Sequence, residues 1–118
     1  MKSYTDIEQS KKLEEILPLE SADMEYMFLK KDGSKVSNVP FVKDGFEEPE
    51  CCYTFIPCWT LTALLGVLPY PSLHKTFSGW RCDSYNKEGT NCKLGESLDN
   101  PVDACVAMTE RLHELNLL

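Results

Sequence analysis

The sequence of 118 residues predicts a single α+β domain, residues 1–118, in which an antiparallel sheet of about five strands packs against about three helices. Two observations predict this class. Apolar residues recur at helical spacing in three segments, and these segments alternate with short strand-like segments bounded by turn residues. The composition is that of a globular protein, with 42% hydrophobic and 26% charged residues, so a disordered or fibrous chain is excluded.

The first helix is expected to begin at Thr5, because Thr5 and Glu8 have the spacing of a capping box. The apolar residues that follow lie near one helical face: Ile7, Leu13, Ile16 and Leu17. Pro18 should end this helix, since a proline disfavours the helical conformation of the residue before it.

A hairpin is expected next, with strands at residues 24–30 and 35–39. Asp32 and Gly33 form a dipeptide that is typical of tight hairpin turns, and Pro40 should end the second strand because it has no N–H to donate. Residues 43–50 contain four carboxylates together with glycine and proline, which indicates a surface loop. A further strand is predicted at residues 53–56, closed by Pro57.

The second helix should start near Thr60 and end at residues 69–71. It has the clearest helical pattern in the chain, formed by Leu61, Leu64, Leu65 and Leu68. Strands are then predicted at residues 73–77 and 80–85, joined by a turn at Ser78 and Gly79, with a further short strand near residues 91–94.

The last helix has the strongest start signal. Asn100 is a good N-cap, Pro101 suits the first helical position, and Asp103 places a negative charge at the positive end of the helix dipole. The residues expected to be buried on this helix are Val102, Cys105, Val106, Met108, Leu112 and Leu115.

The charge balance and the apolar runs narrow the classes of partner. Twelve Lys and Arg stand against nineteen Asp and Glu, a net charge of -7. Direct nucleic-acid binding and attachment to an anionic membrane are therefore not expected, since both need an excess of cations. The longest apolar stretch, residues 55–68, is too short and too interrupted to span a bilayer, and the charged N-terminus does not read as a signal peptide, so we expect a cytoplasmic protein.

Six cysteines could indicate disulfides or a metal site. A cytoplasmic location favours reduced thiols, and the short-spaced ligand pairs typical of zinc sites do not occur. We therefore expect small buried side chains at these positions, no metal ligands and no cofactor.

Three segments of the sequence are similar to a known group of proteins: residues 6–10 with 17–24, residues 56–65, and residues 99–105. In these segments the chain resembles small uncharacterised proteins of phage-like and other mobile elements of Bacteroides-type gut bacteria. The resemblance implies a cytoplasmic accessory protein of a mobile element. It implies no activity, cofactor or catalytic residue.

An enzyme would most readily use Cys58 as a nucleophile, because a thiol beside a helix start can have a lowered pKa. His74 or His113 would serve as the base and Asp83 would orient it. Glu47 and Glu48 form an adjacent carboxylate pair in the predicted loop. The motif of a cysteine hydrolase and the glycine-rich loops that bind phosphates are both missing from the sequence, so we expect no enzyme and no catalytic residue.

The remaining candidates are binding residues. Trp59, Trp80 and Arg81 are the residues most able to anchor a partner, although a tryptophan in the core is the commoner arrangement. Lys75, Trp80, Arg81 and Tyr85 share one predicted hairpin, as in some nucleic-acid-binding sheets, but strand alternation places Trp80 and Arg81 on opposite faces.

The function expected from the sequence is therefore that of a non-enzymatic accessory or regulatory protein of a mobile element that acts by protein–protein contact. The partner would be an unknown protein or, through an exposed strand edge, a second copy in a homodimer. Two alternatives stay open: an acidic inhibitor or DNA mimic that acts on a nucleic-acid-binding protein, and a small cysteine-dependent enzyme.

Overall fold

The computed structural model describes residues 2–43 and 52–118 and has an α+β fold. Its elements, in chain order, are α1 (Ile7–Glu14), the 3-10 helix η1 (Leu19–Ser21), β1 (Met24–Leu29), β2 (Phe41–Val42), β3 (Tyr53–Cys58), α2 (Leu61–Val67), β4 (Pro71–Thr76), β5 (Gly79–Tyr85), β6 (Cys92–Lys93) and α3 (Pro101–Glu114). The expectation of a single sheet of about five strands needs correction. The strands of the described residues form two antiparallel sheets of three strands, in the orders β2-β1-β3 and β4-β5-β6.

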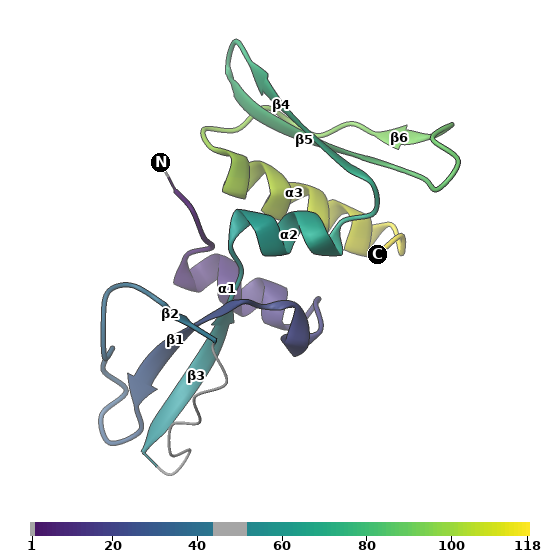
Figure 1. The fold of residues 1–118 in the computed structure, drawn as a ribbon. Helices are drawn as coiled ribbons and strands as arrows, with labels where there is room; N and C mark the ends of the chain where they lie inside the picture. The colour runs from purple at the N-terminus through teal and green to yellow at the C-terminus, as the bar shows by residue number, and fades with distance from the viewer. Residues whose placement is uncertain (1, 44–51) are drawn as a thin grey trace.

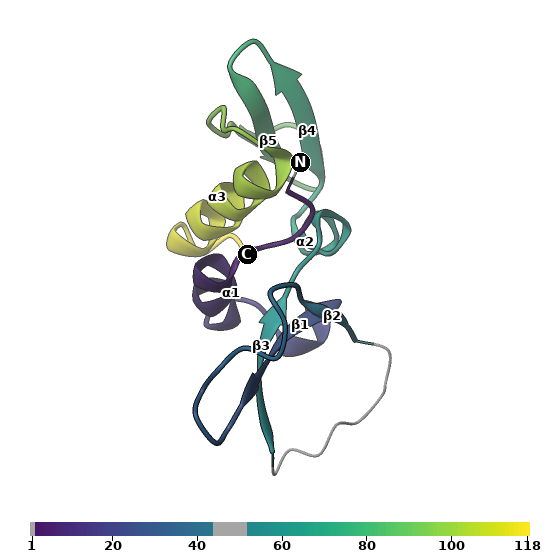
Figure 2. The ribbon, with the colours of Figure 1, turned by 90° about the vertical axis from the view of Figure 1, so that its left-hand side faces the viewer.

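The three α-helices lie between the two sheets (Figures 1 and 2). Helix α3 packs on β5, α2 packs on α3, and α1 packs on β3. The molecule is elongated, with principal extents of 50 × 28 × 23 Å, because the sheets lie at opposite ends of this helical layer. The β4–β5 hairpin consequently forms one end of the molecule.

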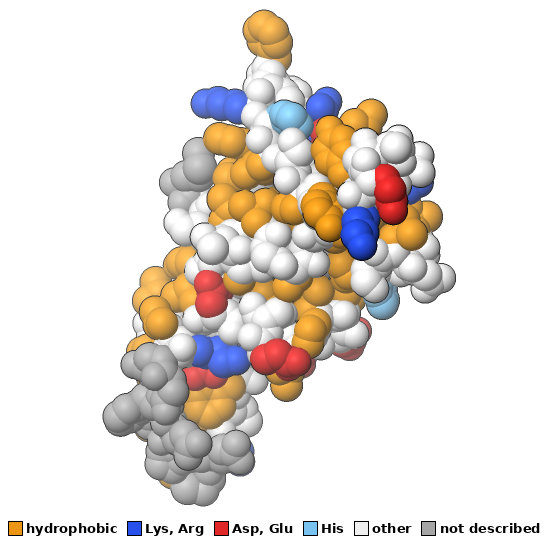
Figure 3. All heavy atoms as spheres, turned by 45° about the vertical axis from the view of Figure 1, so that its right-hand side comes forward, with side chains coloured by type: hydrophobic (Ala, Val, Ile, Leu, Met, Phe, Trp, Pro, Cys, Tyr) orange, Lys and Arg blue, Asp and Glu red, His pale blue; other side chains and the backbone are white. Residues whose placement is uncertain are grey.

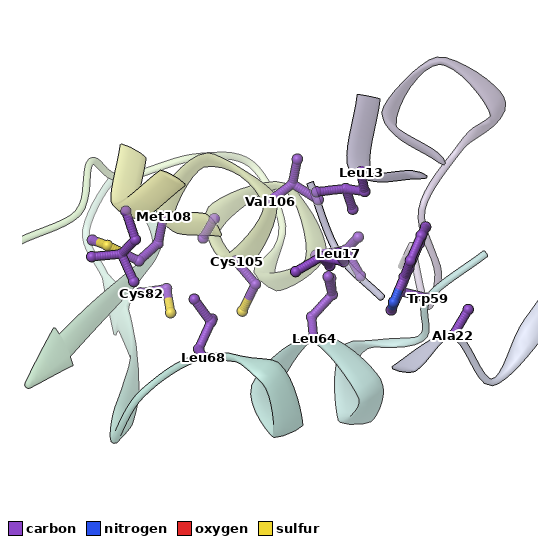
Figure 4. Close-up of a cluster of buried hydrophobic side chains, with 13 residues drawn as sticks. Leu13, Leu17, Ala22, Trp59, Leu64, Leu68, Cys82, Cys105, Val106 and Met108 are labelled. Atoms are coloured by element: carbon purple, nitrogen blue, oxygen red, sulfur yellow. The ribbon is translucent and has the colours of Figure 1, made fainter. Parts of the chain in front are cut away.

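The hydrophobic core is formed mainly by the helices. Its side chains converge from α1, α2 and α3 and are closed off by Cys82 of β5 and by Trp59 (Figure 4). The β2-β1-β3 sheet contributes much less to it, and Tyr26 is the buried residue of β1. The core therefore fixes the β4–β5 hairpin directly onto α3, whereas much of the first sheet extends away from it.

Helix α1 begins one residue later than the sequence predicts. Its N-cap is Asp6, whose side chain accepts from the N–H of Gln9, and the Gln9 side chain accepts from the N–H of Asp6 in return. Thr5 cannot cap the helix because its hydroxyl is buried and is occupied by Ser10 and by the N–H of Trp59. The capping box is thus present but is built from the next pair of residues.

The strand predicted at residues 35–39 is wrong. The turn itself is present, since Gly33 has φ of +72° and its N–H bonds to the carbonyl of Leu29. The pairing then stops after a single bridge between Phe28 and Lys35. The chain returns to β1 only at β2, which pairs with the opposite end of that strand.

Strand β3 includes Pro57, which was expected to close it. Pro57 lies opposite Glu25, and β3 is an edge strand, so the missing N–H of the proline leaves no ladder bond unmade. Strand β4 likewise begins with a proline, Pro71.

The second and third helices start where the sequence predicts. Thr60 caps α2 and Asn100 caps α3, each accepting from the backbone N–H three residues later. The expected burial of Leu115 is wrong, since α3 ends before it and the chain turns at Asn116, which has φ of +57°. None of the helices in the described ranges is both long and apolar enough to cross a membrane.

Candidate functional site

The β4–β5 hairpin brings together more of the expected site residues than any other element. Its two strands pair from Pro71–Ser84 to Thr76–Gly79, which leaves a connecting turn of two residues, Phe77 and Ser78. The expected turn at Ser78 and Gly79 is therefore displaced by one residue. Gly79 instead begins β5 with φ of +142°, a conformation that favours glycine.

The base of this turn is anchored to the loop before α3. The N–H of Trp80 donates to the carbonyl of Leu98 over 2.6 Å, and the N–H of Leu98 donates back over 2.8 Å. A Cβ atom at position 79 would lie 2.1 Å from the same Leu98 carbonyl oxygen, so only glycine permits this approach. The hydroxyls of Thr76 and Ser97 lie 2.9 Å apart and add a further link. The hairpin is thus held in one position up to its last pair of residues.

Phe77 projects from this anchored base into solvent. Its relative exposure is 113%, the highest of the large hydrophobic residues in the described chain. Figure 3 shows a hydrophobic side chain at this extremity, with basic side chains on either side. Phenylalanine is mostly buried in proteins, so a fully exposed one on a fixed turn is a candidate contact residue.

The residues beside the tip are basic, although the chain is acidic overall. The sequence contains no Asp or Glu between Glu50 and Asp83. Within that stretch the hairpin contributes Lys75 and Arg81 together with His74. The Lys75 ammonium lies 5.7 Å from the centre of the Trp80 ring, in a cation–π contact that holds this charge close to the tip.

Trp80 and Arg81 lie on opposite faces of the hairpin, as strand alternation predicts. Trp80 packs partly buried against the core cluster. Arg81 is on the outer face, where its Nη2 donates to Asp83 Oδ2 over 3.1 Å and its Nε lies 3.1 Å from Oδ1. Of the two residues, Arg81 therefore has more polar surface available to a partner, but its charge is largely matched by Asp83.

Asp83 is the centre of a polar cluster on this outer face. Its carboxylate is only 1% exposed and accepts from the N–H of Gly95 over 2.9 Å, as well as from Arg81. His74 Nε2 lies 3.3 Å from Oδ2 of the same carboxylate and 2.9 Å from the Ser72 hydroxyl. The buried charge is thus surrounded by donors from three segments of the chain.

This cluster does not have the geometry of a catalytic relay. In a serine hydrolase the hydroxyl and the carboxylate contact different ring nitrogens, so that a proton taken by one nitrogen is balanced by the carboxylate at the other. Here both Ser72 and Asp83 approach Nε2 of His74. The arrangement is suited to holding the hairpin strands together and not to activating Ser72.

The cysteine triad of the alternative enzyme hypothesis is not assembled. The Cys58 thiol is fully buried, and its hydrogen-bonding partners are Thr5 and not a histidine. Burial raises the pKa of the Cys58 thiol, which disfavours the reactive thiolate. His74 lies in the other sheet, and His113 is on the exposed end of α3.

Trp59, the other tryptophan named from the sequence, is a core residue. Its side chain is 0% exposed, and its indole N–H donates to the Ser21 hydroxyl over 2.9 Å. Trp59 therefore cannot contact a partner in this conformation. Its contribution is to close the core between η1 and the start of α2.

The other predicted positions add no chemistry to the described part of the chain. Glu47 and Glu48 lie outside the described residues. Within residues 2–43 and 52–118, no group of three or more His, Cys, Asp or Glu is placed to hold a metal ion. The cysteines of these ranges are free thiols.

Sequence reasoning missed Phe77, which was placed at the end of the strand predicted at residues 73–77. The signal that could have found it is the length of the turn. A strand pair that closes at Thr76 and Gly79 requires residues 77 and 78 to be the turn, and a turn residue has no sheet face to pack on.

No protein-family model matches the chain, and no significant match is found among curated proteins or solved structures. A function is therefore inferred from the geometry and charge of the β4–β5 hairpin.

Proposed function

We propose that this protein is a non-enzymatic accessory or regulatory protein, of a mobile element as the resemblance implies, that binds another protein through the tip of the β4–β5 hairpin. The observation that carries the proposal is the complete exposure of Phe77 on an anchored two-residue turn. Aromatic side chains are enriched in protein interfaces, because they bury a large area with little loss of side-chain entropy.

Two further features support protein contact at this end of the molecule. The tip is an exposed aromatic side chain, a type that is enriched in protein interfaces, and Lys75 over the Trp80 ring places a cation near it that can steer an acidic partner. The hydrogen bonds to Leu98 fix the tip before any partner arrives, so that little ordering is needed on binding.

The alternative of an acidic inhibitor or DNA mimic has less support. Such a protein presents carboxylates in rows like the phosphates of DNA. The carboxylates of Asp6, at the start of α1, and of Asp103, in the first turn of α3, instead share one lysine, with Lys2 Nζ at 3.0 Å and 2.9 Å. The cysteine-dependent enzyme has less support still, because Cys58 is buried away from both histidines.

The test compares three forms of the full-length chain: the natural protein, Phe77→Ser and the control Leu19→Ser. Leu19 is also an exposed apolar residue, at 57%, but belongs to η1 and not to the hairpin. Each form is used as bait in extracts of the source cells, and each retained protein is then purified and titrated against all three.

We expect one protein to bind the natural chain and the Leu19→Ser control equally. Phe77→Ser should weaken that binding about 30-fold or more, the effect of losing an interface anchor of about 2 kcal/mol. The proposal is refuted if every retained protein binds Phe77→Ser as well as it binds the control. It is also refuted if lipid vesicles, and no protein, distinguish the two variants.

A further inference from the structure

The free edge of β4 is a second exposed feature of the hairpin. Strand β4 runs over six residues, Pro71–Thr76, and pairs on one side with β5. No described residue forms a strand or bridge on its other side. In Figure 2, β4 lies on the side of the hairpin away from α3.

The pairing register identifies which backbone groups point outward from this edge. Because the turn has two residues, Thr76 and Gly79 are a hydrogen-bonded pair, and the pairs Lys75–Trp80 and Leu73–Cys82 are non-hydrogen-bonded. Two observations agree with this assignment. The N–H of Trp80 bonds to Leu98, away from β4, and the carbonyl of Cys82 faces the Cα of Gly95 on that same side. The N–H and C=O groups of Leu73 and Lys75 therefore point into solvent.

This edge has one of the usual protections against strand addition, the charged side chain of Lys75, and lacks the others. Proteins protect long edges with charged side chains, especially lysine, with an internal proline, with a bulge or by keeping the strand very short. The only proline of β4 is its first residue, and its pairing with β5 runs without a bulge through all six residues. By contrast, β2 and β6 have two residues each, and β3 contains Pro57.

The charge around the edge selects the partner. His74 and Lys75 are neighbours in β4, and Arg81 lies opposite His74. Asp83 of β5 lies beside both His74 and Arg81 and offsets the Arg81 charge, so the cation of β4 that forms no salt bridge within the described residues is Lys75. An acidic strand would therefore meet the Lys75 ammonium at this edge, and a basic strand would meet repulsion.

The geometry points to the following inference: the free edge of β4 binds an extended, acidic peptide segment of the partner protein, which adds to the β4-β5-β6 sheet as a further strand. The inference rests on the proposed function, since it names the segment of the partner that lies alongside the hairpin whose tip is Phe77. Backbone groups of Leu73 and Lys75 supply the hydrogen bonds, and the Lys75 ammonium supplies the preference for acidic side chains.

The experiment selects ligands from a displayed library of random ten-residue peptides, using the full-length protein as the target. Peptides retained by Lys75→Pro are discarded, because this variant lacks the outward N–H of residue 75. The best peptide is synthesised and titrated by fluorescence anisotropy against the natural protein and two charge variants. Lys75→Glu reverses a charge at the free edge, and the matched control Lys93→Glu reverses one in β6, at the other edge of the same sheet.

We expect the selected peptides to carry net negative charge. Lys75→Pro and Lys75→Glu should weaken the best peptide at least tenfold, and Lys93→Glu less than threefold. Bound peptide should slow the amide hydrogen exchange of Leu73 and Lys75. This exchange measurement uses the natural protein, so it remains decisive if Lys75→Pro does not fold.

The inference is overturned if every peptide that the natural protein retains is also retained by Lys75→Pro, or if the selected peptides are neutral or basic. It is equally overturned if bound peptide leaves the amide exchange of Leu73 and Lys75 unchanged. It is also overturned if single-stranded DNA binds more tightly than the peptide and depends on Lys75 in the same way. These results are separable from the Phe77 experiment. If Phe77→Ser loses a partner protein but no peptide binds at β4, strand addition alone is overturned. If a peptide binds at β4 but no partner protein depends on Phe77, the proposed contact at the tip is overturned.

Discussion

The contact between Gly79 and Leu98 leads to a quantitative prediction about the hairpin. In Gly79→Ala, the new methyl group would lie 2.1 Å from the Leu98 carbonyl oxygen, so the loop before α3 must move away. The mutation also places alanine at φ of +142°, a strained conformation that costs about 1–3 kcal/mol in a non-glycine residue. Moving the loop breaks both hydrogen bonds between Trp80 and Leu98, each with a net contribution of about 1 kcal/mol.

Together these effects should lower the free energy of unfolding by about 3 kcal/mol or more, a large part of the ~5–15 kcal/mol typical of a domain. The measurement is urea unfolding followed by circular dichroism, with two matched glycine variants. Gly33→Ala adds a methyl group at φ of +72° with no atom within 4 Å, so it should cost only about 1 kcal/mol. Gly66→Ala adds one inside α2, also in open space, and should stabilise by about 0.5–1 kcal/mol.

The order of the three variants tests the reasoning more strictly than any single value. If Gly79→Ala costs no more than Gly33→Ala, the close approach of Leu98 does not hold the hairpin. The anchored tip on which the proposed function depends would then lose its support.

Two other predictions concern ionisable groups. Burial acts to raise the pKa of the Asp103 carboxyl, but hydrogen bonds from Lys2 and Gln9 outweigh it and hold the pKa below its ordinary value. The stabilisation by the ionised Asp103 carboxylate should be fully present above the unfolded pKa of about 4 and be lost as the pH falls through the lower folded pKa. In parallel urea titrations, Asp103→Asn should therefore cost up to about 1 kcal/mol at pH 7 and progressively less as the pH falls below 4. For Cys58, burial raises the pKa of the thiol, so little of the reactive thiolate is expected. Iodoacetamide at pH 7.5 should therefore modify Cys58 only at the rate at which the protein unfolds, as measured by peptide mass spectrometry. Rapid labelling in the folded protein would instead support the hypothesis of a cysteine-dependent enzyme.

The parts of the fold that the sequence predicts well are those fixed by neighbouring residues. Asn100 and Pro101 start α3 through contacts within one turn, and Thr60 does the same for α2. The division into two sheets was not predictable in this way, because it depends on which distant strands pair. The register of β5 with Leu98 and with β6 is decided by packing on α3, and no local pattern encodes it.

The same distinction explains the errors at single residues. Thr5 is a residue type that is favoured as an N-cap, but its hydroxyl accepts a hydrogen bond from the N–H of Trp59, which is distant in sequence. Asp32 and Gly33 do form a turn, yet after the bridge at Lys35 the chain leaves β1 and pairs with it again at β2, at the other end of β1. Trp80 and Arg81 were correctly assigned to opposite faces, since alternation along a strand is a local property.

The exposure of Phe77 and the anchoring of its turn are best understood together. An exposed aromatic residue on a mobile loop would lose much of its binding energy in ordering the loop, because each immobilised group costs conformational entropy. Here that ordering occurs when the chain folds, through Gly79 against Leu98 and Gly95 against the carbonyl of Cys82, 2.2 Å from where a Cβ would lie. The two glycines thus support the contact without touching a partner. We expect substitutions at either position to weaken partner binding even where the protein remains folded, since the tip would then have to be ordered on binding.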